Sequence, residues 1–504
     1  MFEYMYRDIA RKIEDGTLRD GDTLPSMKDL STRYHVGLRT VRDVLSALRT
    51  DGYIATEERK RATVTHRTEA EEDVEATARR VLAGKQDVLE SPKALELIMP
   101  PLFYYAAQHC SESEIGELCR AVKGKEFEVR KGDWRLSRSS LVLHGLLNKT
   151  GNPLLSECYA SLERISIVSV HPSFESPYEK ASIDSGNTLP WIFESLKSKD
   201  FDEVQYRFGS MYSGTAAYIE SYFEELAAAY PYDGPREFAY EWDAKAGKSY
   251  VYAQVARDMV SRMAVGEYVD GEALPSIAAL SEEYGASPST IQKTLGMLNT
   301  MGVVETVNGR GSRVRLSNVR LDPRSVADKV FMRDVDVFVN AAKMVCVILP
   351  AVVNSVSDDL GGVERDALAY LSQKTGEWVV PSALTESLIA HIPIRPLRVV
   401  MTELNDLLIW GHFLMFMGPS EARRSELLSY GYDGIDALRE RDLQGFSDAM
   451  AGYYRCMFAA VQQFFAATRR ANEALADQWR YKAATPVSAG MRSCGSTNTS
   501  PPWA

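Results

Sequence analysis

The 504-residue sequence predicts a mainly α-helical chain that repeats one two-domain plan: a small head of three helices and two short strands, then an all-α body. Three observations predict this fold class. One segment recurs at a constant offset of 250 residues, which indicates a duplicated structural unit. Each copy contains residues that typically start helices, followed by residues that typically end them. In the long stretch after each copy, apolar residues recur every three or four positions, as in amphipathic helices.

The repeat aligns without gaps in the heads. DGDTLPSMKDLSTRYHVGLRTVRDVLSALRTDGYI (20–54) matches DGEALPSIAALSEEYGASPSTIQKTLGMLNTMGVV (270–304). The match continues more loosely into the bodies, where DVLESPKALELIMPPL (87–102) pairs with DVFVNAAKMVCVILPAV (336–352). The simplest explanation is one ancestral two-domain unit that was duplicated and fused, giving a tandem pseudo-dimer.

This plan divides the chain into six segments. The connector between the halves lacks helical periodicity and contains Pro231, Gly234 and Pro235, and the C-terminal tail is small, polar and proline-containing. We expect head 1 at 1–67, body 1 at 68–228, the connector at 229–248, head 2 at 249–315, body 2 at 316–485 and a disordered tail at 486–504.

Charge is distributed unevenly along the chain, whose net charge is −11. Residues 1–67 hold 13 Lys and Arg against 11 Asp and Glu, residues 248–320 hold 8 against 7, and the remainder therefore carries −14. Two mildly basic modules in an acidic body suit local contact with phosphates, with the body held away from them.

Neither membrane insertion nor secretion is expected. The longest apolar run, Met344–Val353, contains a proline and is well short of the ~20 residues that span a bilayer. The N-terminus alternates charged and apolar residues, unlike a secretory signal, so we predict a cytoplasmic protein. Its six cysteines form no C-x-x-C pair, which argues against zinc or redox chemistry.

Each head contains the signals of three helices. The first helix is expected to end at Gly16 or Gly266, and the second to start after Ser26 or Ser276 as N-cap. A short turn at 35–38 or 285–288 leads to the third helix, and two wing strands should follow Gly52 or Gly302. The buried face of the third helix is predicted to hold Val41, Leu45 and Leu48, or Ile291, Leu295 and Leu298.

The opposite face of the third helix is polar near its N-terminus, where a recognition helix presents side chains to the major groove. The wing tips EERKRATV and VNGRGSRV are basic and add phosphate contacts. We therefore predict that double-stranded DNA is contacted by Ser26, Lys28, Arg39, Thr40, Arg42, Lys60, Arg61, Ser276, Ser289, Thr290, Gln292, Lys293, Arg310, Gly311 and Arg313.

With GTLRDGDTLPS followed by Thr40, Val41 and Arg42, head 1 closely resembles the winged helix-turn-helix domain of the GntR family of transcriptional regulators. It departs from the family at Leu38, where the family has an arginine, and its wing has no glycine. Head 2 keeps the glycine-rich wing Gly309–Gly311, but Pro288 and Gln292 replace both family arginines. The resemblance implies sequence-specific DNA binding, and the departures imply that the heads read different half-sites.

Body 1 resembles the helical ligand-binding domain of the FadR/FCD-like subfamily, because HGLLNKTGNPLL contains its histidine and G-N-P-L-L pattern. The family places a metal-binding aspartate four residues before this histidine, but Ser140 stands there, and Ala383 and Ser387 occupy the aligned positions of body 2. We therefore expect no metal, no cofactor, and a small-molecule effector.

The candidate effector residues are Arg135, Arg138, His144 and Asn152. The arginines could bind a carboxylate through paired hydrogen bonds, although a solvated helix face explains them equally well. A satisfied core or pocket histidine is the alternative for His144. His391 has no carboxylate at ligand spacing in the sequence, so a core or surface role is its default.

Two other classes of protein fit parts of the sequence. A scaffold that has lost DNA binding in one or both heads would keep the fold. GntR heads also occur fused to pyridoxal-phosphate-dependent aminotransferase-like bodies of similar total length, but the second head interrupts the space that such an enzyme domain needs. The leading hypothesis remains a non-enzymatic, effector-modulated regulator that binds asymmetric half-sites as a monomeric pseudo-dimer or a homodimer.

Overall fold

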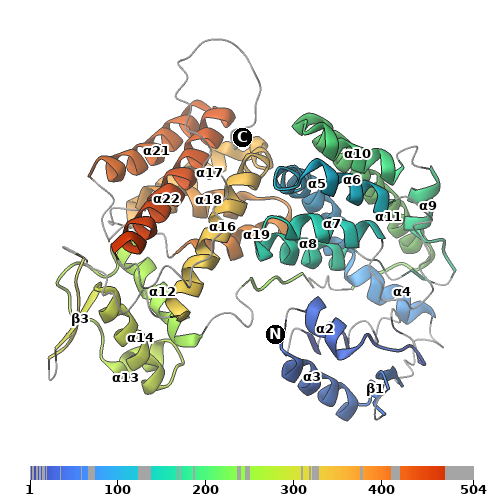
Figure 1. Cartoon of the computed structure of the whole chain (residues 1–504), viewed down its shortest axis with the longest axis horizontal. Helices are drawn as coiled ribbons and strands as arrows, with labels where there is room; N and C mark the ends of the chain where they lie inside the picture. Colours follow the sequence, from blue (N-terminus) through green and yellow to red (C-terminus); the bar gives the residue numbers. More distant parts are fainter. Residues whose placement is uncertain are drawn as a thin grey trace. The chain divides into compact units, whose positions relative to one another are not determined.

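The computed structural model of the chain forms two compact units (Figure 1). Unit 1 comprises Met1–Lys248 with Ile394–Val399, and unit 2 comprises Ser249–Pro393 with Val400–Ala504. Besides single positions between these ranges, the structure describes residues 20–34, 36–57, 60–65, 74–122, 138–166, 173–184, 188–234, 240–244, 250–307, 310–316, 329–374, 379–409 and 421–471.

Head 1 contains helices α2 (Met27–Arg33) and α3 (Leu38–Thr50) and the antiparallel strands β1 (Ile54–Ala55) and β2 (Thr63–Val64). Thr23 adds a single β-bridge to Thr63, which the sequence analysis did not predict. Gly16 and His35 lie outside the described residues. The hydrophobic core draws on residues ahead of α2 as well, and consists mainly of Met5, Ile9, Ile13, Leu18, Leu24, Leu30, Tyr34, Val41, Val44, Leu48, Ile54 and Val64.

The last four elements of head 2 repeat this order. It contains α12 (Val251–Ala264), α13 (Ile277–Glu283), α14 (Pro288–Met301), β3 (Val304–Val307) and β4 (Gly311–Val314). The strands pair antiparallel, and Ala273 bridges to Arg313 as Thr23 does to Thr63. The glycine stop predicted at Gly266 is present, since its φ is 77°, and Gly302, which ends α14, has φ 82°; both lie in the left-handed region that favours glycine.

The predicted buried face of the third helix is confirmed in head 2 and needs one correction in head 1. Ile291, Leu295 and Leu298 are buried in α14. In α3, Val44 is fully buried whereas Leu45 is only partly buried. Both positions lie between Val41 and Leu48 on the same helical stripe, so apolar periodicity alone did not distinguish them.

Body 1 is helical throughout its described residues apart from turns and short loops. A cluster of aromatic rings lies in its core, where Phe208 contacts Phe103 and Phe193 at ring-centroid distances of 4.9 and 5.6 Å. The long helix α5 packs against α8 and α11. The helices are α4 (Val74–Ala83), α5 (Lys85–Ala107), α6 (Glu112–Ala121), α7 (Arg138–Asn148), α8 (Pro153–Ile165), α9 (Pro177–Asp184), α10 (Leu189–Ser198) and α11 (Phe201–Ala229).

Beyond Ala229, which ends α11, the described part of the connector is non-helical, and it packs into unit 1. Tyr240 is buried, its backbone N–H donates to Asp87 Oδ2 at 2.7 Å, and its hydroxyl lies 3.0 Å from Ser161 Oγ. Arg395, which clusters with unit 1, donates to Asp87 Oδ1 at 3.0 Å. The carboxylate of Asp87 is therefore buried with partners on both oxygens, which offsets its loss of hydration.

Body 2 is likewise helical, with α16 packed on α22, α17 on α18, and α21 on α22. By length and composition the segment Met332–Asn354 could cross a membrane, with a mean hydropathy of 1.9, but 56% of it is buried inside the fold, as in a core helix. The elements are α16 (Lys329–Asn354), η2 (Ser357–Asp359), α17 (Leu360–Gln373), α18 (Val379–His391), α19 (Arg395–Leu408), α21 (Glu421–Glu440) and α22 (Leu443–Ala471).

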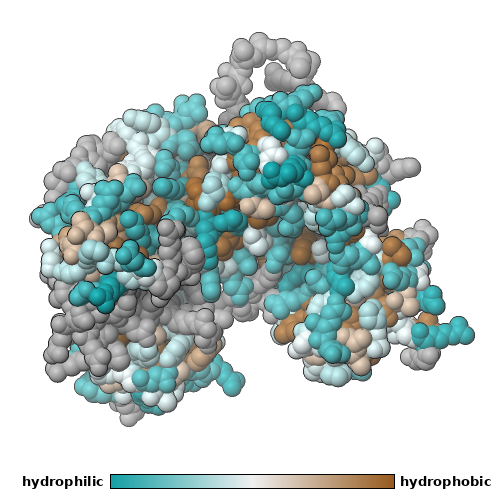
Figure 2. All heavy atoms as spheres, turned by 180° about the vertical axis from the view of Figure 1, so that it is seen from behind, coloured by the Kyte–Doolittle hydropathy of each residue, from teal (hydrophilic) through white to brown (hydrophobic). Residues whose placement is uncertain are grey.

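The mainly α fold class is thus confirmed, with short two-stranded wings as the β component. The described surface in Figure 2 is largely hydrophilic and broken by small hydrophobic patches. Exposed apolar side chains on the heads include Leu38 at the start of α3 and Val307 in β3. Single exposed apolar residues are common on protein surfaces, so their positions matter more than their presence.

Candidate nucleic-acid interface

Helix α3 presents the basic residues predicted for head 1. Arg39 and Arg42 are exposed in its first two turns, while Thr40 is half-buried. No ion pair within the described residues occupies either arginine, so both guanidinium groups are available to phosphates or base edges. Leu38, which replaces a family arginine, is 51% exposed at the first position of the helix. An apolar side chain there can contact a thymine methyl group but cannot form the hydrogen bonds by which an arginine binds guanine.

Helix α14 presents a different set in head 2. Its N-cap Ser287 accepts from the backbone N–H of Thr290 at 3.2 Å, and the Ser287 hydroxyl lies 2.9 Å from the hydroxyls of both Ser289 and Thr290. These two predicted contact residues therefore share hydrogen bonds with a cap that the sequence analysis missed. Gln292 and Lys293 are exposed, and their contact with DNA stays a prediction.

The second helices begin with the predicted serine caps. Ser26 accepts from the backbone N–H of Asp29 at 3.2 Å and forms a capping box with it, and Ser276 accepts from the N–H of Ala279 at 3.2 Å. Hydrogen bonding to Ser26 lowers the pKa of Asp29. Ser276 and Lys28 are exposed and Ser26 is half-buried, so the starts of both helices lie at or near the surface.

The wings carry basic residues at their surface. Lys60 is paired with Glu57 at 2.6 Å, but both side chains are about 70% exposed, so water and salt weaken this pair, and Arg61 is exposed beside it. In head 2, Arg310 and Arg313 are exposed, and Arg313 donates to the carbonyl of Gly271 at 3.2 Å.

Gly311 has φ 83°, and nothing lies within 4 Å of the place that a Cβ would take. It therefore provides backbone conformation at the wing rather than a close approach of neighbouring atoms.

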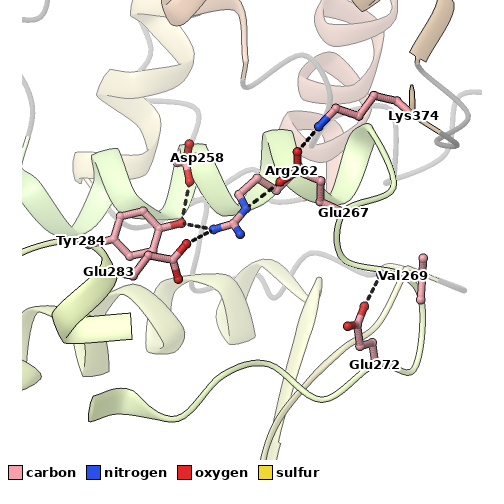
Figure 3. A network of polar contacts seen from close by, with 8 residues as sticks. All are labelled: Asp258, Arg262, Glu267, Val269, Glu272, Glu283, Tyr284 and Lys374. Carbon is pink, nitrogen blue, oxygen red and sulfur yellow. Dashed lines mark hydrogen bonds and ion pairs between the residues drawn. The ribbon is translucent and has the colours of Figure 1, made fainter. Parts of the chain in front are cut away.

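A polar network surrounds the helix-turn-helix of head 2 (Figure 3). Tyr284, which ends α13, donates to Asp258 of α12 at 2.5 Å. Arg262, one turn further along α12, donates to Glu283 at 2.6 Å and to the Tyr284 hydroxyl at 3.2 Å. The network fixes α12 against the end of α13, immediately before the recognition helix. Sequence patterns did not indicate it, because its members lie 21 to 26 residues apart.

The same network reaches body 2. Arg262 donates to Glu267 at 3.0 Å, and Glu267 also pairs with Lys374, which follows α17. The hydrogen bond from Lys374 lowers the pKa of Glu267, so this carboxylate stays ionised at neutral pH. A charged chain therefore links the helix-turn-helix of unit 2 to its helical body (Figure 3).

The candidate effector site in body 1 is centred on His144. Its Nδ1 lies 2.8 Å from Ser156 Oγ, its Nε2 lies 3.4 Å from Glu163 in a geometry that makes no hydrogen bond, and its ring contacts Tyr159 at 4.9 Å between centroids. Burial raises the pKa of Tyr159 well above its usual value, so its hydroxyl stays protonated. Helices α7 and α8 thus form a half-buried polar cluster at the position expected from the family pattern.

The other predicted effector residues have different outcomes. Asn152 is buried and acts as the N-cap of α8, because its Oδ1 accepts from the backbone N–H of Leu154 at 3.1 Å. Gly151 before it has φ 70°. The G-N-P motif therefore has a structural role in starting α8. Arg135 and the side chain of Arg138 lie outside the described residues, so their role stays a prediction, as does the expected absence of a metal.

His391 has two carboxylate partners that its spacing in the sequence did not indicate. Its Nδ1 lies 2.6 Å from Asp359 and its Nε2 lies 2.9 Å from Asp366, so two carboxylates hold this ring. Both partners come from η2 and α17, 32 and 25 residues earlier in the chain. Spacing along one helix could not reveal contacts between helices.

The family model "Bacterial regulatory proteins, gntR family" matches residues 3–64 and 251–314. The mannosyl-D-glycerate transport/metabolism system repressor MngR of Escherichia coli is 33% identical over 76 residues, which is 15% of this chain and 32% of that protein. The repressor NanR of Klebsiella aerogenes is 23% identical over 208 residues, which is 40% of this chain and 78% of that protein. The chain spans about a third of the length of the first of these relatives.

Among solved structures, a GntR-family transcriptional regulator from Pseudomonas syringae pv. tomato aligns with a TM-score of 0.22 and 17% identity, covering 44% of this chain and 90% of that one. The curated relatives are named as regulators or repressors of transcription. The family match falls on both heads, whose third helices present exposed polar and basic side chains. The chain therefore contains two domains that match the GntR family of bacterial regulatory proteins, at residues 3–64 and 251–314.

Proposed function

We propose that the protein is a cytoplasmic transcriptional regulator whose two heads bind adjacent, non-identical half-sites on one DNA duplex. The observation that carries this proposal is the difference between the recognition helices. Head 1 presents two exposed arginines on α3, whereas head 2 presents Gln292 and Lys293 on α14. Arginine favours guanine and glutamine favours adenine, so the preferred operator is asymmetric.

We further propose that the helical bodies modulate DNA binding in response to a small-molecule effector. The similarity to NanR supports this, because a match over 208 residues is far longer than one head and therefore includes part of a body. The half-buried cluster of His144, Ser156 and Glu163 in body 1 supports a pocket of the FCD-like type. Effector binding would shift the population between arrangements that do and do not bind DNA.

The proposal is tested by titrating the full-length protein with its own upstream DNA across a salt series. Specific binding should weaken steeply as salt rises, because phosphate contacts release counterions. Arg42→Ala and Lys293→Ala should each weaken binding, by about 1–3 kcal/mol where the side chain reads a base. Arg439→Ala, which removes an exposed arginine from α21 in body 2, is the matched control and should leave binding unchanged.

Each result has a clear meaning. Loss with Arg42→Ala alone would show that head 2 is structural, which is the scaffold alternative applied to one head. Absence of salt-sensitive binding to any duplex would reject the regulator function and favour a scaffold. Equal losses in Arg439→Ala would mean that nonspecific charge, and not the heads, accounts for the association.

A further inference from the structure

Leu38 is an apolar residue on the part of head 1 that is otherwise polar and basic. It is the first residue of α3, and its side chain is 51% exposed. Arg39 and Arg42, which follow it in the first two turns of the helix, are exposed as well. Leu38 therefore lies on the surface through which head 1 is proposed to bind DNA.

Packing within head 1 does not account for this leucine. The buried side of α3 is formed by Val41, Val44 and Leu48, and Leu45 packs against the same core as a partly buried neighbour. Within the described residues, Leu38 belongs neither to that core nor to the partly buried residues around it. A leucine that is half exposed forgoes much of the stabilisation that burial gives, so the fold of head 1 gains little from it.

The start of the helix does not require a leucine either. Pro288, at the corresponding position of α14, is also exposed, but proline suits the first position of a helix because its φ is fixed and its missing N–H is not needed there. Leucine has no such advantage. The N-cap of α3 is Gly37, which has no side chain and makes no side-chain cap hydrogen bond. No capping side chain therefore covers Leu38.

The major groove of DNA offers one apolar group that a leucine can contact, the C5-methyl group of thymine. The other base edges in this groove present hydrogen-bond donors and acceptors. Contact between Leu38 and a thymine methyl group would remove apolar surface of both partners from water, which is favourable. Against guanine or cytosine, the same side chain would leave polar groups of the base without a partner. Leu38 therefore favours thymine and disfavours the G·C pair.

The position of Arg42 on the same helix indicates where this thymine lies. Leu38 and Arg42 are four residues apart in α3, so their side chains lie on one side of the helix, about 6 Å apart along its axis. Successive nucleotides of one strand are about 3.4 Å apart along the duplex. The two side chains can therefore contact bases that are one or two steps apart.

We propose that Leu38 determines the specificity of head 1 for a thymine, through contact with its C5-methyl group, one or two base steps from the guanine that Arg42 binds. This inference rests on the proposed DNA-binding function and adds a base preference to it. An arginine, which the family has at this position, would select guanine instead. The substitution by leucine therefore changes the preferred base and does not merely remove a contact.

The test uses the full-length protein and a duplex that it selects from a pool of random sequences. Each thymine of this duplex is replaced in turn by deoxyuridine, which lacks only the C5-methyl group. One replacement should weaken binding about three- to fivefold, the factor expected for one buried carbon group, and Leu38→Ala should be insensitive to it. Leu368→Ala, which removes an exposed leucine from α17 in body 2, is the matched control and should keep both the affinity and the sensitivity.

A second variant tests for a gained preference, since selection with Leu38→Arg should replace the thymine by guanine at the same position. The inference is overturned if no thymine is sensitive to loss of its methyl group, if the sensitivity persists in Leu38→Ala, or if Leu38→Arg still selects thymine. Specific binding without a methyl effect that depends on Leu38 contradicts this inference alone. A protein that selects no sequence and shows no salt-sensitive binding contradicts the proposed function, and the inference with it.

Discussion

The buried ion pair between Arg257 and Asp334 gives the sharpest prediction for stability. Arg257 lies on α12 of head 2 and Asp334 on α16 of body 2, with 3.1 Å between Nη1 and Oδ2 and side chains only 6% and 3% exposed. Asp334→Ala leaves a buried guanidinium without its main counter-charge, which typically costs about 3–5 kcal/mol. For a unit of this size that corresponds to a fall in Tm of about 6–20 °C.

Scanning calorimetry and urea unfolding of the full chain measure this loss. Asp448→Ala, which removes an exposed carboxylate from α22, is the control and should change stability by less than about 0.5 kcal/mol. The double variant Arg257→Met/Asp334→Leu should recover most of the loss, because no charge is left buried. A loss below about 1 kcal/mol for Asp334→Ala, or a double variant as unstable as the single one, would refute the reasoning.

Three further outcomes are expected. His391 is partly buried, which alone would lower its pKa, but the hydrogen bonds that its ring donates to the carboxylates of Asp366 and Asp359 outweigh this and raise the pKa. The stability that protonated His391 contributes should therefore be fully present below the ordinary histidine pKa of 6.5 and be lost as pH rises through the higher pKa of the folded state. NMR titration of the imidazole and the pH dependence of unfolding of His391→Gln check this. A histidine pKa that is not raised would contradict it. Asn152→Ala should destabilise body 1 by about 1 kcal/mol through the loss of its cap, and Asn152→Asp should retain most of that stability, as judged by urea unfolding. Gly302→Ala should lower the free energy of unfolding by about 1–2 kcal/mol because Gly302 has a positive φ. Gly296→Ala, within α14 and with open space at its Cβ position, should raise it by up to ~1 kcal/mol. Equal effects of the two substitutions would argue against Gly302 as the C-cap of α14.

The heads were largely predictable because their determinants are local. Caps at Ser26 and Ser276, a left-handed glycine at 302 and apolar residues at helical spacing each act within a few residues of sequence. The constant offset of the repeat let each head confirm the other. The β-bridges of Thr23 and Ala273 were missed because a single bridge has no period to detect.

The contacts between different helices were not predictable, because the residues that meet are far apart in the sequence. The partners of His391 lie 25 and 32 residues away, and the bond between Tyr284 and Asp258 spans 26 residues across two helices. Which of these side chains meet depends on how helices pack. A cavity lined by Asp258 of α12 and by Tyr453 of α22 is the clearest case, because its walls come from a head and a body that the sequence patterns mark as separate domains.

The burial of Tyr240 changes where one half of the chain can be separated from the other. A break directly after α11, at Ala229, would remove the backbone N–H that satisfies Asp87, and would leave a fully buried carboxylate short of a donor. The stretch that sequence alone marks as a connector therefore belongs to the folded first half at least as far as Ala244, which is also buried. Any recombination of halves between related proteins should preserve the first half through that residue and join within 245–249.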